Sequence, residues 1–359
     1  MYRIWRRWLS LLTALALALV FCFAACPFAA FADDTGQKVY QDMIYYTITP
    51  MHEVTITGAR AILTEANIPA ELDGCPVTEI ERYAFKDCTR LKQVTLPDTI
   101  RRIGEFAFKD CTRLERISIP DTVSDIGWGI VQGTPWLDNQ TEEFVIAGKG
   151  FLLAYTGADA TVTIPDTVST IGGYAFEGCT SLVHVVLPDT LTKLGVAAFR
   201  SCSGLTAVKF PANLTELPEA VFHKCVALST ENGSMDLSNS SLQIVGGDAF
   251  GGCENLDNLT FPACFTTLSA NAFYAREHRQ RTVTFSGNAC MLPDEAGIFP
   301  QDTVLRGQKN SPAQTYAEKY SLEFQALPDE TPASTTTAKT TTTIVEHTTK
   351  RSTSKIVTT

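Results

Sequence analysis

The chain of 359 residues holds 29 lysines and arginines against 39 aspartates and glutamates, which gives a formal net charge of −10. This acidic balance argues against nucleic acid as a partner, because binding to phosphate backbones needs a basic surface. Beyond residue 32, no stretch approaches the ~20 apolar residues of a membrane-spanning helix. We therefore expect no membrane span in the mature chain.

Residues 1–32 predict a secretory signal peptide. Three arginines precede a long apolar run, and Ala30-Phe31-Ala32 has the small-residue pattern of a cleavage site. Cleavage leaves 26 basic against 39 acidic residues and a net charge of −13. A retained membrane anchor and a lipid attached at Cys26 are the alternatives, and the acidic pair Asp33-Asp34 after the small residues favours cleavage.

The mature chain, from residue 33, begins with an N-terminal cap and a degenerate first repeat over residues 33–76. From there a pattern returns with a period of 23 residues: Ala-Phe, then a cysteine three residues on, then Leu-x-x-Val-x-Leu-Pro-Asp-Thr. A fixed period of this length predicts a solenoid, in which stacked neighbours bury the apolar face of each unit. The phenylalanine position is filled by Phe85, Phe108, Phe176, Phe199, Phe222, Phe250 and Phe273.

Each unit predicts one short parallel strand, followed by a segment that runs back across the solenoid and carries the phenylalanine. In the unit before Phe108, Val94 and Leu96 share one face of a strand, while Gln93 and Thr95 point the other way. The proline that follows ends the strand, since it cannot donate to the ladder. We expect the phenylalanines to stack from unit to unit, each contributing roughly 1.5–3 kcal/mol of burial free energy.

The long step from Phe108 to Phe176 indicates a decayed unit and an insertion. Val131 stands in the phenylalanine position of the decayed unit, and Thr134 stands in its cysteine position. Within residues 135–160, two apolar runs flank a glycine-containing turn at 147–150, which predicts a β-hairpin.

Six cysteines occupy one repeat position, and their spacing comes from the repeat rather than from metal-ligand geometry. In a secreted protein cysteines often form disulfides. Their shared apolar surroundings favour a ladder of buried free thiols over pairing. The six are Cys88, Cys111, Cys179, Cys202, Cys225 and Cys253.

The repeat fades after Phe273. Residues 282–285 predict a last strand, and Ser311-Pro312 predicts the start of a helix that continues to Tyr320. We interpret residues 286–328 as a C-terminal cap. Thirteen of the 29 residues in 331–359 are threonine, so residues 329–359 predict a disordered linker or tail.

These repeats resemble the BspA-like class of leucine-rich repeats, found in secreted and surface proteins of bacteria and some protozoa. The likeness rests on Ile103–Cys111, Val162–Val168 and the closing Ser311–Tyr320, and it covers about residues 40–327. The chain departs from ordinary leucine-rich repeats in lacking an asparagine ladder. The resemblance implies a solenoid with short parallel strands, short helical pieces and a role in adhesion or protein binding.

The ligand is expected on the outward, concave face of the repeat strands, where side chains form two columns. Solenoids use such extended surfaces for binding, although an ordinary solvated sheet face is the alternative. The first column holds Gln93, Arg116, His184, Ala207 and Asn258, and the second holds Thr95, Ser118, Val186, Lys209 and Thr260.

Catalytic, metal and cofactor sites are not predicted. The five histidines are scattered, and the aspartates after each proline supply one carboxylate per turn where calcium needs several oxygens. An enzyme site hidden in residues 135–160 would have only Glu142, Glu143 and Lys149. We therefore expect a monomeric, secreted or cell-surface, non-catalytic module that binds an extracellular protein or glycan. The alternative is a structural spacer that carries another module through the threonine-rich tail.

Overall fold

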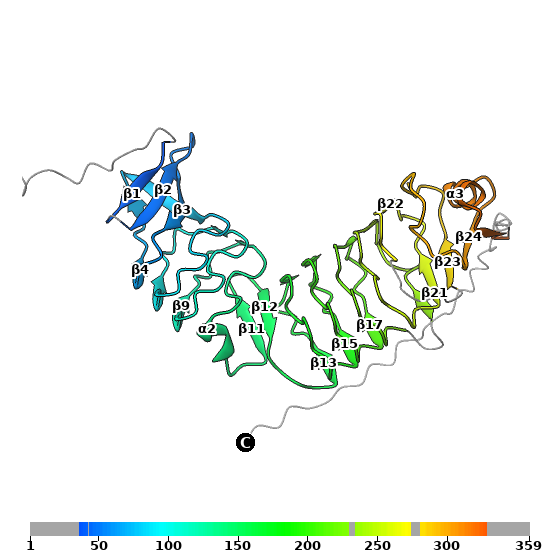
Figure 1. Ribbon diagram of the computed structural model, residues 1–359, viewed down its shortest axis with the longest axis horizontal. Coiled ribbons are helices and arrows are strands. Elements are labelled where there is room, and N and C mark those ends of the chain that lie inside the picture. The colour runs from blue at the N-terminus through cyan, green and yellow to red at the C-terminus, as the bar shows by residue number, and fades with distance from the viewer. Residues whose placement is uncertain (1–35, 42, 230–233, 274–280, 329–359) are drawn as a thin grey trace, which may run out of the picture. The chain divides into compact units, whose positions relative to one another are not determined.

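The computed structural model describes residues 36–41, 43–229, 234–273 and 281–328 (Figure 1). The predicted signal peptide at 1–32 and the threonine-rich tail at 329–359 lie outside the described residues. The repeats form a β-solenoid, as their period predicts. Each repeat is one rung, built from a three-residue strand, a two-residue strand and a tight turn.

The three-residue strands carry the Val-x-Leu part of the repeat. Their central residue is buried, as with Val94 at 2 % exposure, and its two neighbours face outward. They form parallel sheets in the orders β4-β7-β9, β13-β15-β17 and β19-β21-β23-β24-β25, and Figure 1 shows β13, β15 and β17 side by side. The bounds are β4 (Glu65–Asn67), β7 (Gln93–Thr95), β9 (Arg116–Ser118), β13 (Thr161–Thr163), β15 (His184–Val186), β17 (Ala207–Lys209), β19 (Ser234–Asp236) and β21 (Asn258–Phe261).

The two-residue strands follow the Pro-Asp-Thr turn and bury their second residue. They pair in parallel with the same strand of the next rung, for example Ile103 with Ile126 and Ile171 with Leu194. The bounds are β8 (Arg102–Ile103), β10 (Asp125–Ile126), β14 (Thr170–Ile171), β16 (Lys193–Leu194), β18 (Glu216–Leu217), β20 (Ile244–Val245) and β22 (Thr267–Leu268).

The threonine of the Pro-Asp-Thr turn ties consecutive rungs together. Its hydroxyl donates to a backbone carbonyl of the preceding rung: Thr99 to Val77 at 2.7 Å, and Thr190 to Val168 at 2.8 Å. A threonine hydroxyl at this position therefore gives a hydrogen-bond donor to a backbone carbonyl oxygen of the preceding rung.

A third hydrogen-bond ladder runs through the tight turns around the phenylalanines. The amides of the phenylalanine and of the residues two before and two after it donate to the next rung, as Tyr83, Phe85 and Asp87 do. The two flanking residues have positive φ, 62° at Tyr83 and 60° at Asp87. Left-handed residues thus begin and end the turn, and the amides of every second residue donate along the stack; we call these hydrogen bonds the turn ladder.

The phenylalanines stack inside the core, as the period predicts. Ring centroids of successive phenylalanines lie 4.8 Å apart for Phe176 and Phe199, and 6.0 Å apart for Phe222 and Phe250. Four cysteine thiols donate to the carbonyl oxygen of a phenylalanine in the preceding rung, for example Cys202 to Phe176 at 3.0 Å. Five of the six ladder cysteines are buried, while Cys179 is only partly buried.

The glycine that follows most of the two-residue strands is required by the close approach of neighbouring rungs. A Cβ at Gly104 would lie 2.4 Å from the backbone nitrogen of Arg82, and one at Gly195 would lie 2.2 Å from that of Gly173. Their φ values are not positive. Glycine therefore recurs at this position because a side chain would clash with the neighbouring rung, and not because the backbone conformation requires it.

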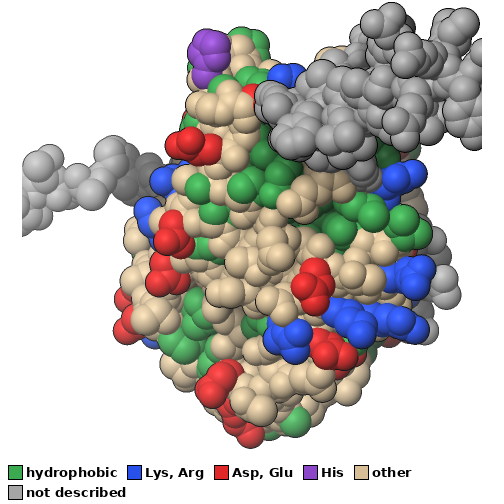
Figure 2. Space-filling view, turned by 90° about the vertical axis from the view of Figure 1, so that its left-hand side faces the viewer, with side chains coloured by type: hydrophobic (Ala, Val, Ile, Leu, Met, Phe, Trp, Pro, Cys, Tyr) green, Lys and Arg blue, Asp and Glu red, His purple; other side chains and the backbone are tan. Residues whose placement is uncertain are grey.

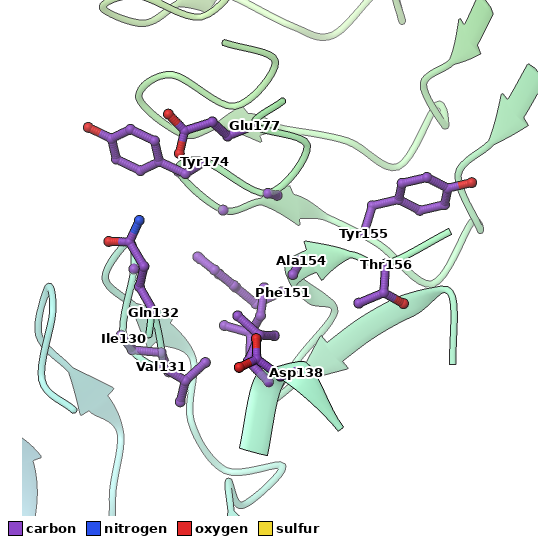
Figure 3. Close-up of a pocket in the computed structure, with 16 residues that line it drawn as sticks. Ile130, Val131, Gln132, Asp138, Phe151, Ala154, Tyr155, Thr156, Tyr174 and Glu177 are labelled. Atoms are coloured by element: carbon purple, nitrogen blue, oxygen red, sulfur yellow. The ribbon is translucent and has the colours of Figure 1, made fainter. Parts of the chain in front are cut away.

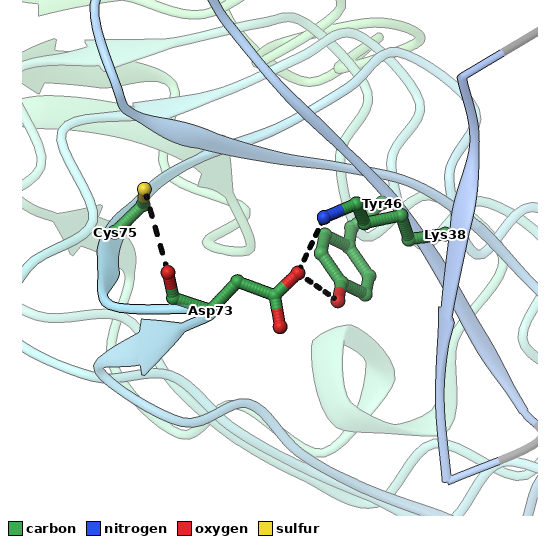
Figure 4. A network of polar contacts seen from close by, with 4 residues as sticks. All are labelled: Lys38, Tyr46, Asp73 and Cys75. Atoms are coloured by element: carbon green, nitrogen blue, oxygen red, sulfur yellow. Dashed lines mark hydrogen bonds and ion pairs between the residues drawn. The ribbon is translucent and has the colours of Figure 1, made fainter. Parts of the chain in front are cut away.

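The N-terminal cap is an antiparallel sheet that covers the first rung. β1 (Lys38–Tyr40), β2 (Ile44–Ile48) and β3 (Val54–Ala59) pair in sequence, and β3 then pairs in parallel with β6 (Cys75–Ile80). β5 (Glu71–Leu72) pairs with the start of β6. Figure 4 shows the polar contact that fixes the cap to this turn: Asp73 accepts from Lys38 at 2.6 Å and from Tyr46 at 3.1 Å.

The insertion forms the predicted hairpin. A one-turn helix, α2 (Pro135–Asp138), leads into β11 (Phe144–Ala147) and β12 (Phe151–Tyr155), which pair antiparallel. β12 then joins the two-residue strands by pairing in parallel with β14. The buried apolar residues fall into two hydrophobic cores that meet here, one from Ile44 to Val131 and one from Leu152 to Ala317.

The C-terminal cap is larger than the sequence predicts. Residues 281–285 form β23 (Arg281–Phe285), but this is not the last strand, because β24 (Thr303–Gly307) and β25 (Glu323–Ala326) extend the same sheet. α3 (Pro312–Tyr320) begins as predicted, and Ser311 Oγ accepts from the amide of Gln314. Phe299 also continues the phenylalanine stack, 5.5 Å from Phe273.

Candidate functional site

The predicted binding columns stand in register on the outer face of the three-residue strands. Gln93 pairs with Arg116 and Thr95 with Ser118 in the first sheet. His184 pairs with Ala207 and Val186 with Lys209 in the second. Asn258 and Thr260 stand in the third sheet, opposite Thr282 and Thr284.

The columns do not run unbroken through one sheet. Arg116 ends the β4-β7-β9 sheet, and Lys209 ends the β13-β15-β17 sheet. Arg116 Nε donates to Gln93 Oε1 at 3.0 Å, which holds the guanidinium along the sheet face. Thr95, Arg116, Ser118, His184 and Lys209 are exposed, while Gln93, Val186, Ala207, Asn258 and Thr260 are half-buried.

A second candidate site lies where the hairpin interrupts the turn ladder. After the turn that holds Gly129 and Val131, the chain forms α2 and the hairpin instead of another tight turn. β12 supplies only Tyr155, whose amide donates to Ala175 at 2.8 Å and whose ring stacks 5.0 Å from Phe176. The two turns still meet at one end, since a Cβ at Gly173 would lie 2.5 Å from Trp128 Cβ, so the space left by the absent turn opens toward Val131 and Glu177.

This gap is a cavity of about 290 Å³, which we call the missing-rung cleft. Figure 3 shows Phe151 and Ala154 between the turn of Ile130 and Gln132 and the turn of Tyr174 and Glu177. The volume is near the lower limit of ligand pockets, ~300 Å³. The cleft therefore has room for a short segment of a ligand.

The wall on the Val131 side presents unused backbone donors. In the rungs of Phe85, Phe108, Phe176, Phe199 and Phe222, all three turn-ladder amides donate to the next rung. The corresponding amides of Gly129 and Val131, which line the cleft, have no acceptor within the described residues, and neither has that of Gly133, which is exposed outside the lining. The carbonyls of Gly173 and Glu177 on the opposite wall likewise receive no amide there.

The lining of the missing-rung cleft is acidic at its rim and apolar inside. Its lining includes the carboxylates of Asp138 and Glu177, both exposed, and no lysine or arginine. Glu177 has a distant ion pair with Arg200, at 3.7 Å. Burial raises the pKa of Tyr174, so its hydroxyl stays protonated and can donate at neutral pH.

A smaller cleft of about 210 Å³ lies on the other side of Gly172 and Gly173. Its lining includes Trp128, whose ring lies 5.6 Å from that of Tyr174 and 4.4 Å from that of Phe106. Tyr83 continues this aromatic row at 5.5 Å from Phe106. Arg102 at its edge is held between Glu79 at 3.0 Å and Asp125 at 3.1 Å.

The end of the molecule at the N-terminal strands carries charges of both signs (Figure 2). Lysines and arginines are intermixed there with aspartates and glutamates. Such a surface has no large field of one sign to attract a polyanion.

The residues that an enzyme site would need are not brought together. Glu142, Glu143 and Lys149 are exposed, and none of them lines either cleft. Within the described residues, no group of three metal-ligating side chains could hold an ion. The same residues contain no helix with the length and apolar character of a membrane span.

Comparison with known proteins identifies the repeats. The model of the BspA type leucine-rich repeat region matches six copies over residues 62–140 and 154–278, more than half of the chain. The chain belongs to the BspA-type leucine-rich repeat family. The unmatched residues 141–153 coincide with β11 and the first half of β12, so the break in the family pattern is the insertion that forms the missing-rung cleft.

Solved structures of bacterial leucine-rich repeat proteins are similar to this chain. The T. pallidum protein TpLRR is 28% identical, over 61% of this chain and 90% of that one, with a TM-score of 0.35. A protein from Bacteroides ovatus is 24% identical over 80% and 76%, with a TM-score of 0.39. The pneumococcal vaccine antigen PcpA is 14% identical over 81% and 99%, with a TM-score of 0.46. No curated protein matches the chain.

Sequence reasoning located the columns but missed the missing-rung cleft. It recognised Val131 in the phenylalanine position and the hairpin after it. It did not recognise that Tyr155 takes the next position, because Tyr155 lies inside a strand pattern rather than after an Ala-Phe pair. That substitution, 24 residues after Val131, was the available signal.

Proposed function

We propose that this BspA-type protein is a secreted or cell-surface binding module that recognises an extracellular protein or glycan and carries out no catalysis. The observation that carries the proposal is the set of outward columns, in register and with half of their residues exposed, on strands whose central residues are buried in the core. Side chains in the columns can vary without unfolding the stack, which suits repeat surfaces to recognition. The predicted signal peptide supports an extracellular location.

Arg116 and Lys209 are the proposed charged anchors of this face. Both are exposed, and neither has an ion pair within the described residues. Because they end two different sheets, each contributes to binding separately. A ligand that spans the insertion would contact both, and a smaller ligand would contact one.

The second candidate function is a spacer that carries another module through the threonine-rich tail. The regular stack favours it, since a solenoid is stiff along its length. A spacer predicts no saturable ligand for the columns, whereas a binding module requires one.

The experiment begins with the full chain on arrays of extracellular proteins and glycans. For a saturable ligand, Arg116→Ala or Lys209→Ala should weaken affinity by about two- to fivefold, the range of exposed ion pairs. The melting temperature should stay nearly unchanged. Lys149→Ala, an exposed lysine at the hairpin turn, is the matched control and should bind as the parent does. If the parent protein bound no array member saturably, the spacer function would be favoured.

A further inference from the structure

We propose that the missing-rung cleft binds an extended peptide that carries a lysine or arginine, and that this peptide takes the place of the absent turn. The proposal rests on the proposed binding function in one respect only, that the protein acts by binding. It assigns a second surface, distinct from the strand columns, and a chemical class of ligand to it.

The backbone pattern favours a peptide. Gly129 and Val131, two residues apart, line the cleft, and in the neighbouring rungs the amides at these positions donate to carbonyls that also recur at every second residue. An extended peptide offers carbonyls with that periodicity, which is how peptides add to an open sheet edge. A glycan has hydroxyls without that repeat.

The buried position of Val131 makes the missing acceptor of its amide costly. Val131 is 3% exposed, and an unpaired buried amide costs about 1–3 kcal/mol. A ligand that supplies carbonyls at Gly129 and Val131 recovers part of that cost. The carbonyl of Glu177, on the opposite wall, can accept from an amide of the same ligand across the cleft.

The charge of the lining selects the side chain. Asp138 and Glu177 stand at the rim without a lysine or arginine among the lining residues, and Asp138 has no ion pair within the described residues. A basic side chain in the peptide would meet Asp138, while its aliphatic stem packs against the apolar lining formed by Leu137 and Phe151.

The test is selection of a phage-displayed heptapeptide library on the full chain, followed by affinity measurements with the enriched synthetic peptides. We expect enrichment of lysine or arginine at one position. Ala154→Phe should fill the cleft and weaken peptide binding more than tenfold. Asp138→Asn should weaken it by about two- to fivefold, the range of an exposed ion pair.

Matched controls carry the same chemical changes outside the cleft. Ala158→Phe places the ring on an exposed connector, and Glu143→Gln removes an exposed carboxylate that does not line the cleft. Both variants should bind the peptides as the parent does. Melting temperatures of all four variants separate loss of binding from loss of folding.

A direct readout of the backbone contacts is amide hydrogen exchange. Bound peptide should slow exchange at residues 129 and 131, and Ala154→Phe should remove that effect. Equal peptide affinity in the parent and Ala154→Phe would overturn the proposal, as would enrichment of acidic peptides. Saturable binding of an array glycan that Ala154→Phe blocks would assign the cleft to carbohydrate instead. None of these results depends on Arg116 or Lys209, so failure here is distinguishable from failure of the strand-face proposal.

Discussion

At the residue scale, the tight turns depend on backbone conformations that most side chains avoid. The position two residues after the phenylalanine has positive φ in successive rungs, and it holds Asp87, Asp110, Ser201 and Lys224 as well as glycines. A left-handed residue with a Cβ costs roughly 1–2 kcal/mol. The stack tolerates this cost because the turn ladder needs the conformation.

Gly178 tests that account, because its φ is +73° and nothing stands within 4 Å of the site of a Cβ. We expect Gly178→Ala to lower the free energy of unfolding by about 1 kcal/mol through backbone strain alone. Gly178→Asn should cost less, although asparagine is larger, because it tolerates left-handed backbone. Urea denaturation measures both, and a larger loss for asparagine than for alanine would point to crowding rather than strain.

The buried cysteines should make the protein sensitive to alkali. Burial raises the pKa of Cys111, Cys253 and Cys290 from the ordinary 9.0 to about 12. Below pH 9 folded and unfolded chains hold these protons equally. Between about pH 9 and 12 only the unfolded chain releases them, so the free energy of unfolding should fall by about 1.4 kcal/mol per pH unit for each thiol.

Urea denaturation at several pH values between about 8 and 10.5 measures this slope. Cys111→Ala should be less stable than the parent at about pH 8 but should lose stability less steeply as the pH rises. Cys264→Ala removes an exposed thiol and is the control, with the slope of the parent. The same slope in Cys111→Ala as in the parent would mean that Cys111 already ionises in the folded chain.

Residue identities also set the limit of prediction at this scale. The phenylalanine and cysteine positions were predictable because a 23-residue period repeats them in register. Phe299 and Tyr155 were not, since each fills the same stack from a segment without the repeat pattern. These two rings join the stack through tertiary packing, which a repeat pattern in the sequence cannot predict.

At the element scale, the sequence predicted best the elements that have local signals for a helix start or a turn. Ser311-Pro312 predicted the start of α3, and a glycine-containing turn between apolar runs predicted the β11–β12 hairpin. β24 and β25 were missed because their sequences lack the Leu-x-x-Val-x-Leu pattern. β24 is a strand because β23 offers it an open sheet edge, and β25 then pairs with the edge of β24.

The two ends of α3 should respond to substitution in opposite directions. Ser311→Ala removes the acceptor for the Gln314 amide and should cost about 1 kcal/mol. Ser321 follows the helix with φ +57°, so Ser321→Gly should stabilise the protein. Thermal unfolding of both variants checks this, and a stabilising Ser311→Ala would exclude the serine as an effective cap.

The missing-rung cleft is also an element-scale feature that the sequence does not disclose. The hairpin was predictable, but the cleft depends on β12 pairing with β14 while it makes no turn-ladder bond to Val131. Pairing choices between neighbouring strands are set by packing of both faces. Along β12, Phe151 and Leu153 pack against the N-terminal core, and Leu152 and Tyr155 belong to the C-terminal core.

At the scale of the whole described molecule, the repeats do not share one core. The phenylalanine stack runs from Phe85 to Phe108, stops at Val131 and restarts at Tyr155. In a repeat protein stability is nearly a sum over rungs and their nearest-neighbour interfaces. The junction is the weakest interface of this kind because it lacks both stacked phenylalanines and the turn ladder.

The two cores should therefore unfold separately, and a matched pair of substitutions tests it. Phe108→Ala and Phe199→Ala each remove a fully buried ring and should cost about 3–5 kcal/mol locally. Hydrogen exchange should accelerate over residues 54–131 in Phe108→Ala and over residues 152–273 in Phe199→Ala, with little change in the other core. Acceleration across both cores in either variant would show that the hairpin couples them into one cooperative unit. In that case Phe151→Ala, which removes a ring of β12 that packs against the N-terminal core, should restore separate unfolding.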